Sequence, residues 1–247
     1  MSLTPEAETP SGAAGPSAPA FDMAFLSALQ LSDTFFPTGL YTLSHGLEAF
    51  VQAGLVSKAE VEALLRDYLE NVLGPADGVA LSHAHRATEG RDLGRLMEID
   101  RRLFALKLVR EGREASRRVG KRILTTAVKL SPNSLLRDYW TAVGASACPG
   151  NAAVALGAVT ATLGIARREA MLIELYTFTA SVLGAAMRLI RLDHEEAQLI
   201  LGGLRHFMVR VVQENIDKGL QEMRAFAPLI DIMGAMHERA RVRLFIS

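Results

Sequence analysis

The fold is decided by the stretch Ala152-Ala-Val-Ala-Leu-Gly-Ala-Val-Thr-Ala-Thr-Leu-Gly164, in which every side chain is small or apolar and none is charged. A helix of this composition has no polar face, so it must be buried on every side. Small side chains also let neighbouring helices approach closely. We therefore expect residues 152–164 to form the central helix of a bundle. Residues 181–188 have a similar composition and predict a second closely packed helix.

Outward from this stretch, apolar residues recur at helical spacing, and the alternating runs typical of strands are hard to find. The sequence Ser57-Lys-Ala-Glu60 has the form of a capping box and predicts a helix start. Gly74-Pro75 predicts the end of that helix and the start of another, which should run to about residue 89. Clear breaks follow at residues 131–134 and 148–151.

Further helices are expected at residues 92–108, then in a segment that ends at residue 130, and at residues 167–192, 193–226 and 229–241. The segment 193–226 should be broken near Gly202-Gly203 and Gly219, and the last helix follows Pro228. The connections between them are short, about two to six residues, and such connections are typical of neighbouring helices in one domain. The pattern therefore predicts an all-α fold, a compact multi-helix bundle around the small-residue-rich central helix.

The length of 247 residues allows a sizeable core. Residues 1–20 are rich in Pro, Ala, Ser and Gly and predict a disordered leader. A single domain is expected over residues 21–247. The longest apolar run, about 15 residues, is short of the roughly 20 needed to cross a bilayer, so no membrane segment is expected. The single cysteine, Cys148, excludes an internal disulfide, fits a reducing cytosol, and is expected to be buried.

Charge is balanced overall but not along the chain. The sequence has 27 Lys and Arg against 27 Asp and Glu, which excludes a generally basic nucleic-acid-binding protein. However, nine basic residues lie between Arg101 and Arg122, where the only acids are Glu111 and Glu114. This stretch could be a solvated or internally paired face, a surface for a protein partner, or a nucleic-acid-binding helix. The last reading lacks aromatic side chains for bases and a helix-turn-helix pattern.

Motifs for catalysis or metal binding are missing from the sequence: it has no phosphate-binding loop, no nucleophile elbow, no HExxH and no CxxC. His83 and His85 are two residues apart, so on a helix they point in nearly opposite directions and could not easily bind one ion. Residues 193–196, Asp-His-Glu-Glu, contain ligand-type side chains, but acids also favour the first turn of a helix. We expect a non-enzymatic protein, and the alternative is an enzyme with a metal site at His83 or His194.

An unusual apolar segment spans residues 35–48, Phe-Phe-Pro-Thr-Gly-Leu-Tyr-Thr-Leu-Ser-His-Gly-Leu-Glu. Proline and glycine restrict the backbone here, and Ser44 is a suitable N-cap that would place Glu48 in the first helical turns. Such a segment is either a buried connector between helices or a docking surface with exposed aromatic side chains. The residues alone leave both readings open.

The segment resembles the P-x-G-x-[FY]-x-x-S-x-G-L-E signature of the UreF-type urease accessory proteins, through Pro37, Gly39, Tyr41, Ser44, Gly46, Leu47 and Glu48. Further matches follow in the order of that family at Glu111, Arg113, Ser116, Gly120, Ile123 and Leu124, and then at Ala186, Arg188, Leu189 and Gln198. The last residues resemble the family's closing H-E-x-x-x-x-R-L-F-x-S, through His237, Glu238, Arg243, Leu244, Phe245 and Ser247. Together the matches span nearly the whole chain after the leader.

Three departures from the family pattern stand out. Leu40 occupies the position of a second glycine, and Asn151 that of a histidine. Residues 191–198 read Arg-Leu-Asp-His-Glu-Glu-Ala-Gln where the family has P-L-G-Q-x-x-G-Q. The loss of a proline and two glycines predicts a more regular helix in this segment.

The resemblance implies a cytoplasmic, dimeric scaffold that binds the accessory protein UreD, also called UreH, and recruits and modulates the GTPase UreG. The complex would deliver nickel to apo-urease, and the scaffold itself would hold no cofactor tightly. The partner-binding residues that it implies are Pro37, Gly39, Tyr41, Ser44, Gly46, Glu48, Arg113, Ser116, Arg188, Gln198, His237, Arg243, Leu244, Phe245 and Ser247. A basic helical nucleic-acid-binding protein is the alternative.

Overall fold

A computed structural model describes residues 18–240 and 243–246, and within these ranges every regular element is helical. The all-α prediction is therefore confirmed. The α-helices are α1 (Ala18–Ser32), α2 (Leu47–Gln52), α3 (Val61–Tyr68), α4 (Val79–Glu89), α5 (Leu93–Leu106), α6 (Arg110–Leu130), α7 (Ser134–Gly144), α8 (Ala152–Thr162), α9 (Arg167–Leu189), α10 (His194–Gly203), α11 (Arg205–Asn215) and α12 (Pro228–His237). A π-helix, η2 (Leu69–Gly78), joins α3 to α4, and single 3₁₀ turns lie at η1 (Leu40–Thr42) and η3 (Leu220–Glu222).

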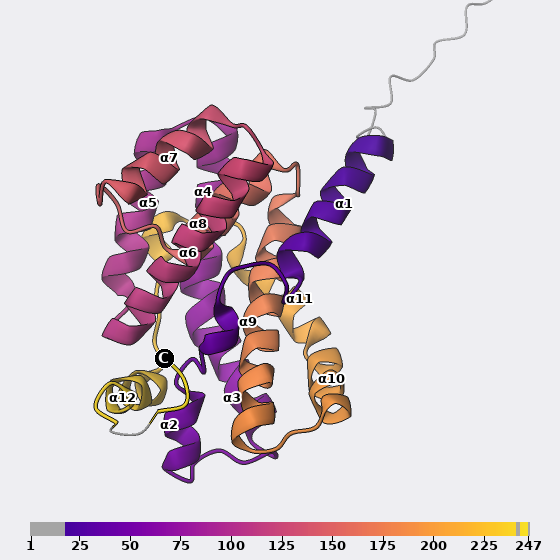
Figure 1. Ribbon diagram of the computed structural model, residues 1–247, viewed down its shortest axis with the longest axis vertical. Helices are drawn as coiled ribbons and strands as arrows, with labels where there is room; N and C mark the ends of the chain where they lie inside the picture. Colours follow the sequence, from indigo (N-terminus) through magenta and orange to yellow (C-terminus); the bar gives the residue numbers. More distant parts are fainter. Residues whose placement is uncertain (1–17, 241–242, 247) are drawn as a thin grey trace, which may run out of the picture.

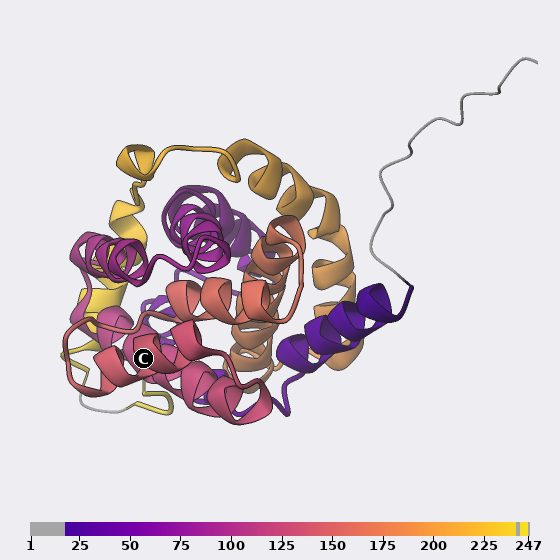
Figure 2. The ribbon, with the colours of Figure 1, turned by 90° about the horizontal axis from the view of Figure 1, so that it is seen from above.

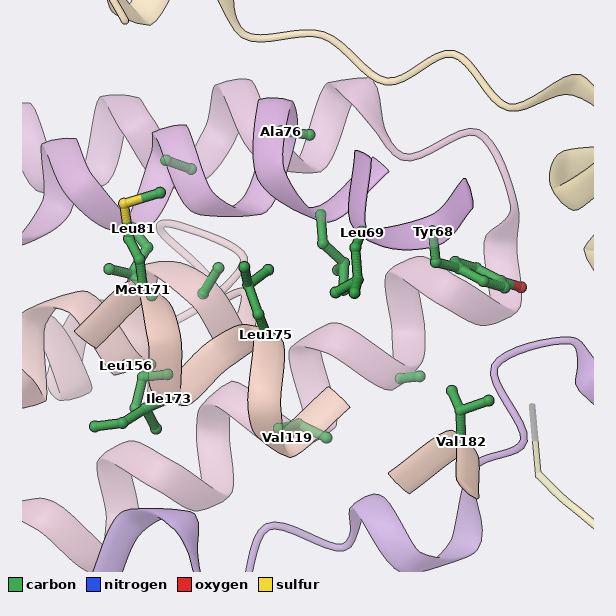
Figure 3. Packing of buried hydrophobic residues seen from close by; sticks show 14 of the residues in the cluster. Tyr68, Leu69, Ala76, Leu81, Val119, Leu156, Met171, Ile173, Leu175 and Val182 are labelled. Atoms are coloured by element: carbon green, nitrogen blue, oxygen red, sulfur yellow. The ribbon is translucent and has the colours of Figure 1, made fainter. Parts of the chain in front are cut away.

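Helix α8 is central, as its composition predicts, and its residues 153–160 are all buried. It lies among the other helices when the bundle is seen from above (Figure 2) and packs mainly on α4 and α6. A Cβ atom on Gly157 would lie 2.6 Å from the Leu81 carbonyl oxygen, so the glycine lets α4 and α8 meet backbone to backbone. Leu156 projects from α8 near Ile173 and Met171 of α9 in the close view of the core (Figure 3).

The start of α8 is held by a buried carboxylate. Asp100, on α5, accepts hydrogen bonds from the backbone N–H groups of Gly150 (2.6 Å) and Asn151 (2.8 Å) and from the Tyr139 hydroxyl (2.9 Å). Burial beside this carboxylate raises the pKa of the Cys148 thiol to about 12, and Cys148 is buried as predicted. Asn151, which replaces the histidine of the family pattern, binds the same carboxylate through its side-chain amide at 2.6 Å.

The prediction that a helix ends at Gly74-Pro75 is wrong. The chain stays helical from Val61 to Glu89, and Pro75 lies inside η2. Proline cannot donate to the carbonyl of residue 71, which would be orphaned in a regular helix. Here the Phe226 N–H donates to the Asn71 oxygen (3.1 Å), and the Arg224 N–H donates to the Pro75 oxygen (3.1 Å). A neighbouring segment therefore satisfies the carbonyl groups that the proline and the wider π-helix leave open.

The prediction of a more regular helix over residues 191–198 is also wrong. Helix α9 ends at Leu189, and Arg191 adopts the left-handed region with φ of 54°. Asp193 then caps α10 and forms a capping box with Glu196, so the acids of residues 193–196 begin a helix as expected. At the start of α3, Ser57 and Glu60 do bond to one another, but the residue at the cap position is Glu60, not Ser57.

Helix α1 projects from the body of the bundle (Figures 1 and 2). It begins at Ala18, so the last residues of the predicted leader are helical; residues 1–17 lie outside the described residues. Its exposed large apolar side chains are Phe21, Met23, Phe25, Leu26 and Leu29. By length and composition α9 could cross a membrane, but 56% of its most apolar window is buried inside the bundle, as in the core helix of a globular protein.

Candidate partner-binding site

The signature residues that are furthest apart in the sequence meet at one end of the molecule. The segment of residues 37–48, the start of α6, the end of α9 and the end of α12 all border the C-terminal residues 243–246, which we call the strap. In Figure 1 the yellow segment before the C mark, which includes the strap, lies near α12 and α2.

Glu48 is the anchor of this site. Its side chain is 2% exposed, and its carboxylate accepts hydrogen bonds from the strap N–H groups of Leu244 (2.8 Å) and Phe245 (3.1 Å). The carboxylate is positioned because α2 begins at Leu47, directly after Gly46 with φ of 83°. The prediction that Ser44 caps this helix is therefore wrong: Gly46 is the cap residue, and Ser44 is fully buried.

His237, at the end of α12, connects two of the acids. Its Nε2 lies 3.2 Å from a Glu48 oxygen and its Nδ1 lies 2.7 Å from a Glu111 oxygen, while the ring itself is 1% exposed. Glu111 also accepts a hydrogen bond from Arg243 of the strap. This network, in which the Glu48 and His237 side chains are buried, fixes the relative positions of α2, α6, α12 and the strap.

Arg188 holds the strap from the other side. Its guanidinium carbon lies 4.3 Å from the centroid of the Tyr41 ring and 4.2 Å from that of Phe245, and its Nη2 donates to the Tyr41 carbonyl oxygen at 2.7 Å. The Ile246 N–H donates to the Thr42 oxygen (3.1 Å), so the strap runs along the segment of residues 37–48. Phe245 is buried, whereas the Tyr41 side chain is 74% exposed.

Residues 35–48 combine the burial expected of a connector with the exposed aromatic side chains expected of a docking surface. Phe36, Leu43 and Leu47 are buried in the core, as in a connector. Phe35 and Tyr41 are exposed, as on a docking surface. Gly39, with φ of 80°, makes the turn before η1 that carries Tyr41 outward, and Pro37 lies just before it.

His45 connects the segment of residues 37–48 to α9 and α3. Its Nε2 lies 3.1 Å from the Ser181 hydroxyl of α9, and its carbonyl oxygen accepts a hydrogen bond from the Tyr68 hydroxyl. Burial, with a smaller effect of Lys107, lowers the pKa of His45 to about 4. The His45 ring is therefore neutral at physiological pH. Its packing against Phe178, with 4.5 Å between the ring centroids, is consistent with a neutral ring because an apolar neighbour disfavours the charged form.

A cavity of about 490 Å³ lies beneath this segment, lined by apolar side chains and by a small polar group that sequence reasoning missed. Lys107 donates to both carboxylate oxygens of Asp77 (2.7 and 2.8 Å). Burial and the nearby charge of Asp77 raise the pKa of Glu174 to about 8, against a smaller opposing effect of Lys107. No sequence motif joins these residues, which are brought together by η2, the end of α5 and α9.

Glu174 should make folding stability depend on pH. The pKa of Glu174 is raised in the folded protein. Its contribution to the free energy of unfolding is therefore fully present below pH 4.5, its pKa in the unfolded chain, and is lost as the pH rises through 8. We expect the free energy of unfolding to fall between these two values by an amount that Glu174→Gln removes. Denaturant unfolding at pH 5.5 and 8.5 measures this, with Glu169→Gln, at an exposed position of the same helix, as the control. Equal pH dependence in Glu174→Gln and the unsubstituted chain would contradict the assignment.

Three of the predicted site residues, Arg113, Ser116 and Gln198, are not part of this network. Arg113 donates to the Lys107 (2.7 Å) and Leu108 (2.8 Å) carbonyl oxygens, so it fixes the turn between α5 and α6. The Ser116 hydroxyl accepts from the Ala152 N–H (3.1 Å) and joins α6 to α8. Gln198 is exposed on α10, and Ser247 lies outside the described residues. Leu244 belongs to the strap, but its side chain is 75% exposed.

Within residues 18–240 and 243–246, no group of three or more His, Cys, Asp or Glu side chains has the arrangement of a metal site. His83 and His85 bind different carbonyl oxygens, those of Lys218 (2.9 Å) and Ile165 (2.8 Å). They tie α4 to separate neighbouring segments, as the simpler sequence interpretation predicts. The clustered side chains of the site, such as Glu48 and Arg188, hold the strap and the segment of residues 37–48 in place, and the Tyr41 side chain stays exposed beside them.

The fold and the site define a helical protein in which a C-terminal strap and an exposed aromatic segment form one surface. Comparison with known proteins shows which family the chain belongs to. The family model UreF matches residues 55–205. The Urease accessory protein UreF 2 of Brucella canis (strain ATCC 23365 / NCTC 10854 / RM-666) is 33% identical over 225 residues, covering 90% of this chain and 91% of the relative.

Two other relatives have similar coverage. The Urease accessory protein UreF of Trichodesmium erythraeum (strain IMS101) is 35% identical over 225 residues, covering 89% of this chain and 95% of the relative. That of Actinobacillus pleuropneumoniae serotype 3 (strain JL03) is 31% identical over 220 residues, covering 89% and 97%. The chain belongs to the UreF family of urease accessory proteins.

Proposed function

We propose that this protein is a cytoplasmic, non-enzymatic scaffold for urease maturation, which binds UreD/UreH and recruits and modulates the GTPase UreG. The observation that carries the proposal is the convergence of the family signature residues on one surface. Glu48, His237, Arg188, Arg243 and Phe245 come from four separate parts of the chain, and together they fasten the strap beside the exposed Tyr41. An exposed aromatic residue on a preorganised backbone suits protein recognition.

A second part of the proposal is that the scaffold is a homodimer. The exposed apolar side chains of α1, among them Phe21, Phe25 and Leu29, form a surface that favours burial against another chain. In the assembled complex, nickel passes to apo-urease without a tightly bound cofactor in this subunit. Size-exclusion chromatography with light scattering of the unsubstituted chain and of Leu26→Arg tests dimerisation. A monomeric unsubstituted chain would contradict it.

Tyr41→Ala should weaken association with the accessory proteins while leaving the fold intact. The Tyr41 side chain is 74% exposed, and its main contact is the Arg188 guanidinium, so we expect a stability loss of about 1 kcal/mol or less. Loss of an aromatic hot spot from an interface costs at least about 2 kcal/mol, or more than tenfold in affinity. A pull-down with UreD and UreG, followed by titration calorimetry, measures the effect.

The control for this experiment is Tyr176→Ala, which removes a partly exposed tyrosine (41%) from α9 and should leave both associations unchanged. Failure of the unsubstituted chain to bind either UreD or UreG would overturn the scaffold proposal. Equal affinity of Tyr41→Ala and the unsubstituted chain would keep the scaffold but remove Tyr41 from its interface.

A further inference from the structure

The outer face of the α6–α7 hairpin carries a row of cations that the strap site does not use. Helices α6 and α7 pack against each other, as Figure 1 shows. Arg118, Lys121, Arg122 and Lys129 are all exposed and are spaced along α6 so that they lie on one face. On α7, Arg137 is exposed three residues before Trp140. We call these six residues the α6–α7 basic face.

The cations of this face differ from the other arginines of α6. Arg113 and Arg117 bind carbonyl oxygens or a carboxylate of the chain. By contrast, across the part of the chain that the structure describes, the side chains of Arg118, Lys121, Arg122, Lys129 and Arg137 take part in no ion pair and no hydrogen bond. The reading of the stretch as internally paired therefore holds up to Arg117, and only its last three cations, Arg118, Lys121 and Arg122, are available to an acidic partner.

Trp140 gives the basic face an apolar centre. Its side chain is 38% exposed, and its indole N–H donates to the Thr125 hydroxyl of α6 at 3.2 Å. Thr125 lies one turn after Lys121 and one turn before Lys129, so the ring is placed beside the row of cations. Because its polar group already has a partner, the indole offers apolar surface. Leu130, 56% exposed, extends this surface at the end of α6.

These features fit an acidic protein segment better than a nucleic acid. The row on α6 runs over 12 residues of helix, from Arg118 to Lys129, and its ends are about 16 Å apart at 1.5 Å per residue, which is the length of a short helix. Binding of single-stranded nucleic acid relies on several aromatic platforms, and this face has one. Its cations are combined with two apolar side chains, a combination that matches a helix with acidic and apolar residues on one side.

We propose that the α6–α7 basic face binds an acidic, amphipathic segment of a partner protein, with carboxylates on Arg118, Lys121 and Arg122 and an apolar side chain on Trp140. The face adjoins the strap site, because a Cβ atom on Gly39 would lie 3.7 Å from Arg122. The proposal adds a partner chemistry to the proposed scaffold and does not depend on which protein supplies it.

The test uses the full chain and a fluorescein-labelled peptide of about 16 residues, long enough to form a helix, with a stripe of Glu flanked by Leu. Arg118→Glu/Lys121→Glu should weaken binding about tenfold or more relative to the unsubstituted chain, and raised salt should weaken it in both. Arg168→Glu/Arg205→Glu changes the net charge equally at exposed sites on α9 and α11, and it should bind like the unsubstituted chain. Trp140→Gln should weaken binding while the circular dichroism spectrum stays unchanged.

Three results would overturn the proposal. One is absence of binding at low salt, and another is an equal loss in the two double variants, which would reflect net charge alone. The third is tighter binding of duplex or single-stranded DNA than of the peptide, with the same dependence on Arg118 and Lys121, which would favour the nucleic-acid reading. Any of these results leaves the Tyr41→Ala experiment unaffected, so failure here can be distinguished from failure of the proposed scaffold.

Discussion

Gly120→Ala should destabilise the protein by several kcal/mol, although alanine is normally the better residue in a helix. A Cβ atom on Gly120 would lie 2.1 Å from the Gly150 carbonyl oxygen and 2.7 Å from the Asn151 carbonyl carbon. Both atoms belong to backbone that the Asp100 carboxylate fixes, so they cannot move away easily. The clash must separate α6 from the start of α8, and overpacking of this kind costs about 1–3 kcal/mol or more.

The same helix supplies the matched control. Gly112 also lies in α6, but a Cβ atom there would meet only the Val109 side chain, at 3.9 Å. Gly112→Ala should therefore stabilise by up to about 1 kcal/mol, the difference in helix propensity. Urea unfolding of the two variants gives the comparison. Similar stabilities would mean that α6 and the segment of residues 150–152 are not packed as described.

The helices and the central position of α8 could be predicted because they depend on local patterns of apolar and small residues. The prediction that the helix breaks at Gly74-Pro75 was wrong for a non-local reason. The Phe226 N–H, about 150 residues away along the chain, donates to the Asn71 carbonyl oxygen in place of the N–H that the proline lacks. The left-handed Arg191 shows the converse, since the chain turns there without the proline and glycines of the family pattern. Neither outcome can be derived from the residues near the break.

In the site, likewise, the sequence could identify individual residues but not the contacts between them. The family motifs singled out Glu48, His237 and Arg243 individually, but motifs in order along a chain do not say which of them touch. Their meeting depends on the path of every helix between residues 48 and 237. Glu111 is the residue that links His237 to Arg243, yet sequence reasoning treated it only as part of a motif. The Asp77–Lys107 pair and Glu174 lie outside the quoted motifs, and charge counting alone could not have placed them.

Glu48→Gln should release the strap, and this is the largest functional effect that we expect. The carboxylate accepts from two strap N–H groups and faces His237, all in a buried position. Glutamine has the same shape but one oxygen and an amide NH₂, so one of the donors would face another donor. Hydrogen bonds to a charged group contribute about 1.5–3 kcal/mol each, and an unsatisfied buried donor adds its desolvation cost.

Hydrogen exchange measures this directly at the amides of Leu244 and Phe245. Loss of about 3 kcal/mol corresponds to at least a hundredfold loss of protection there, whereas amides in α8 should change much less because the hydrogen bonds that are lost hold the strap and not α8. Glu62→Gln is the control, since its exposed pair with Arg66 within α3 is worth about 0.5 kcal/mol. If the strap contributes to partner binding, Glu48→Gln should also lose affinity for the accessory proteins despite an intact Tyr41. Unchanged protection at Leu244 and Phe245 would show that Arg188 and Arg243 hold the strap without the carboxylate, and the anchoring role would then pass to them.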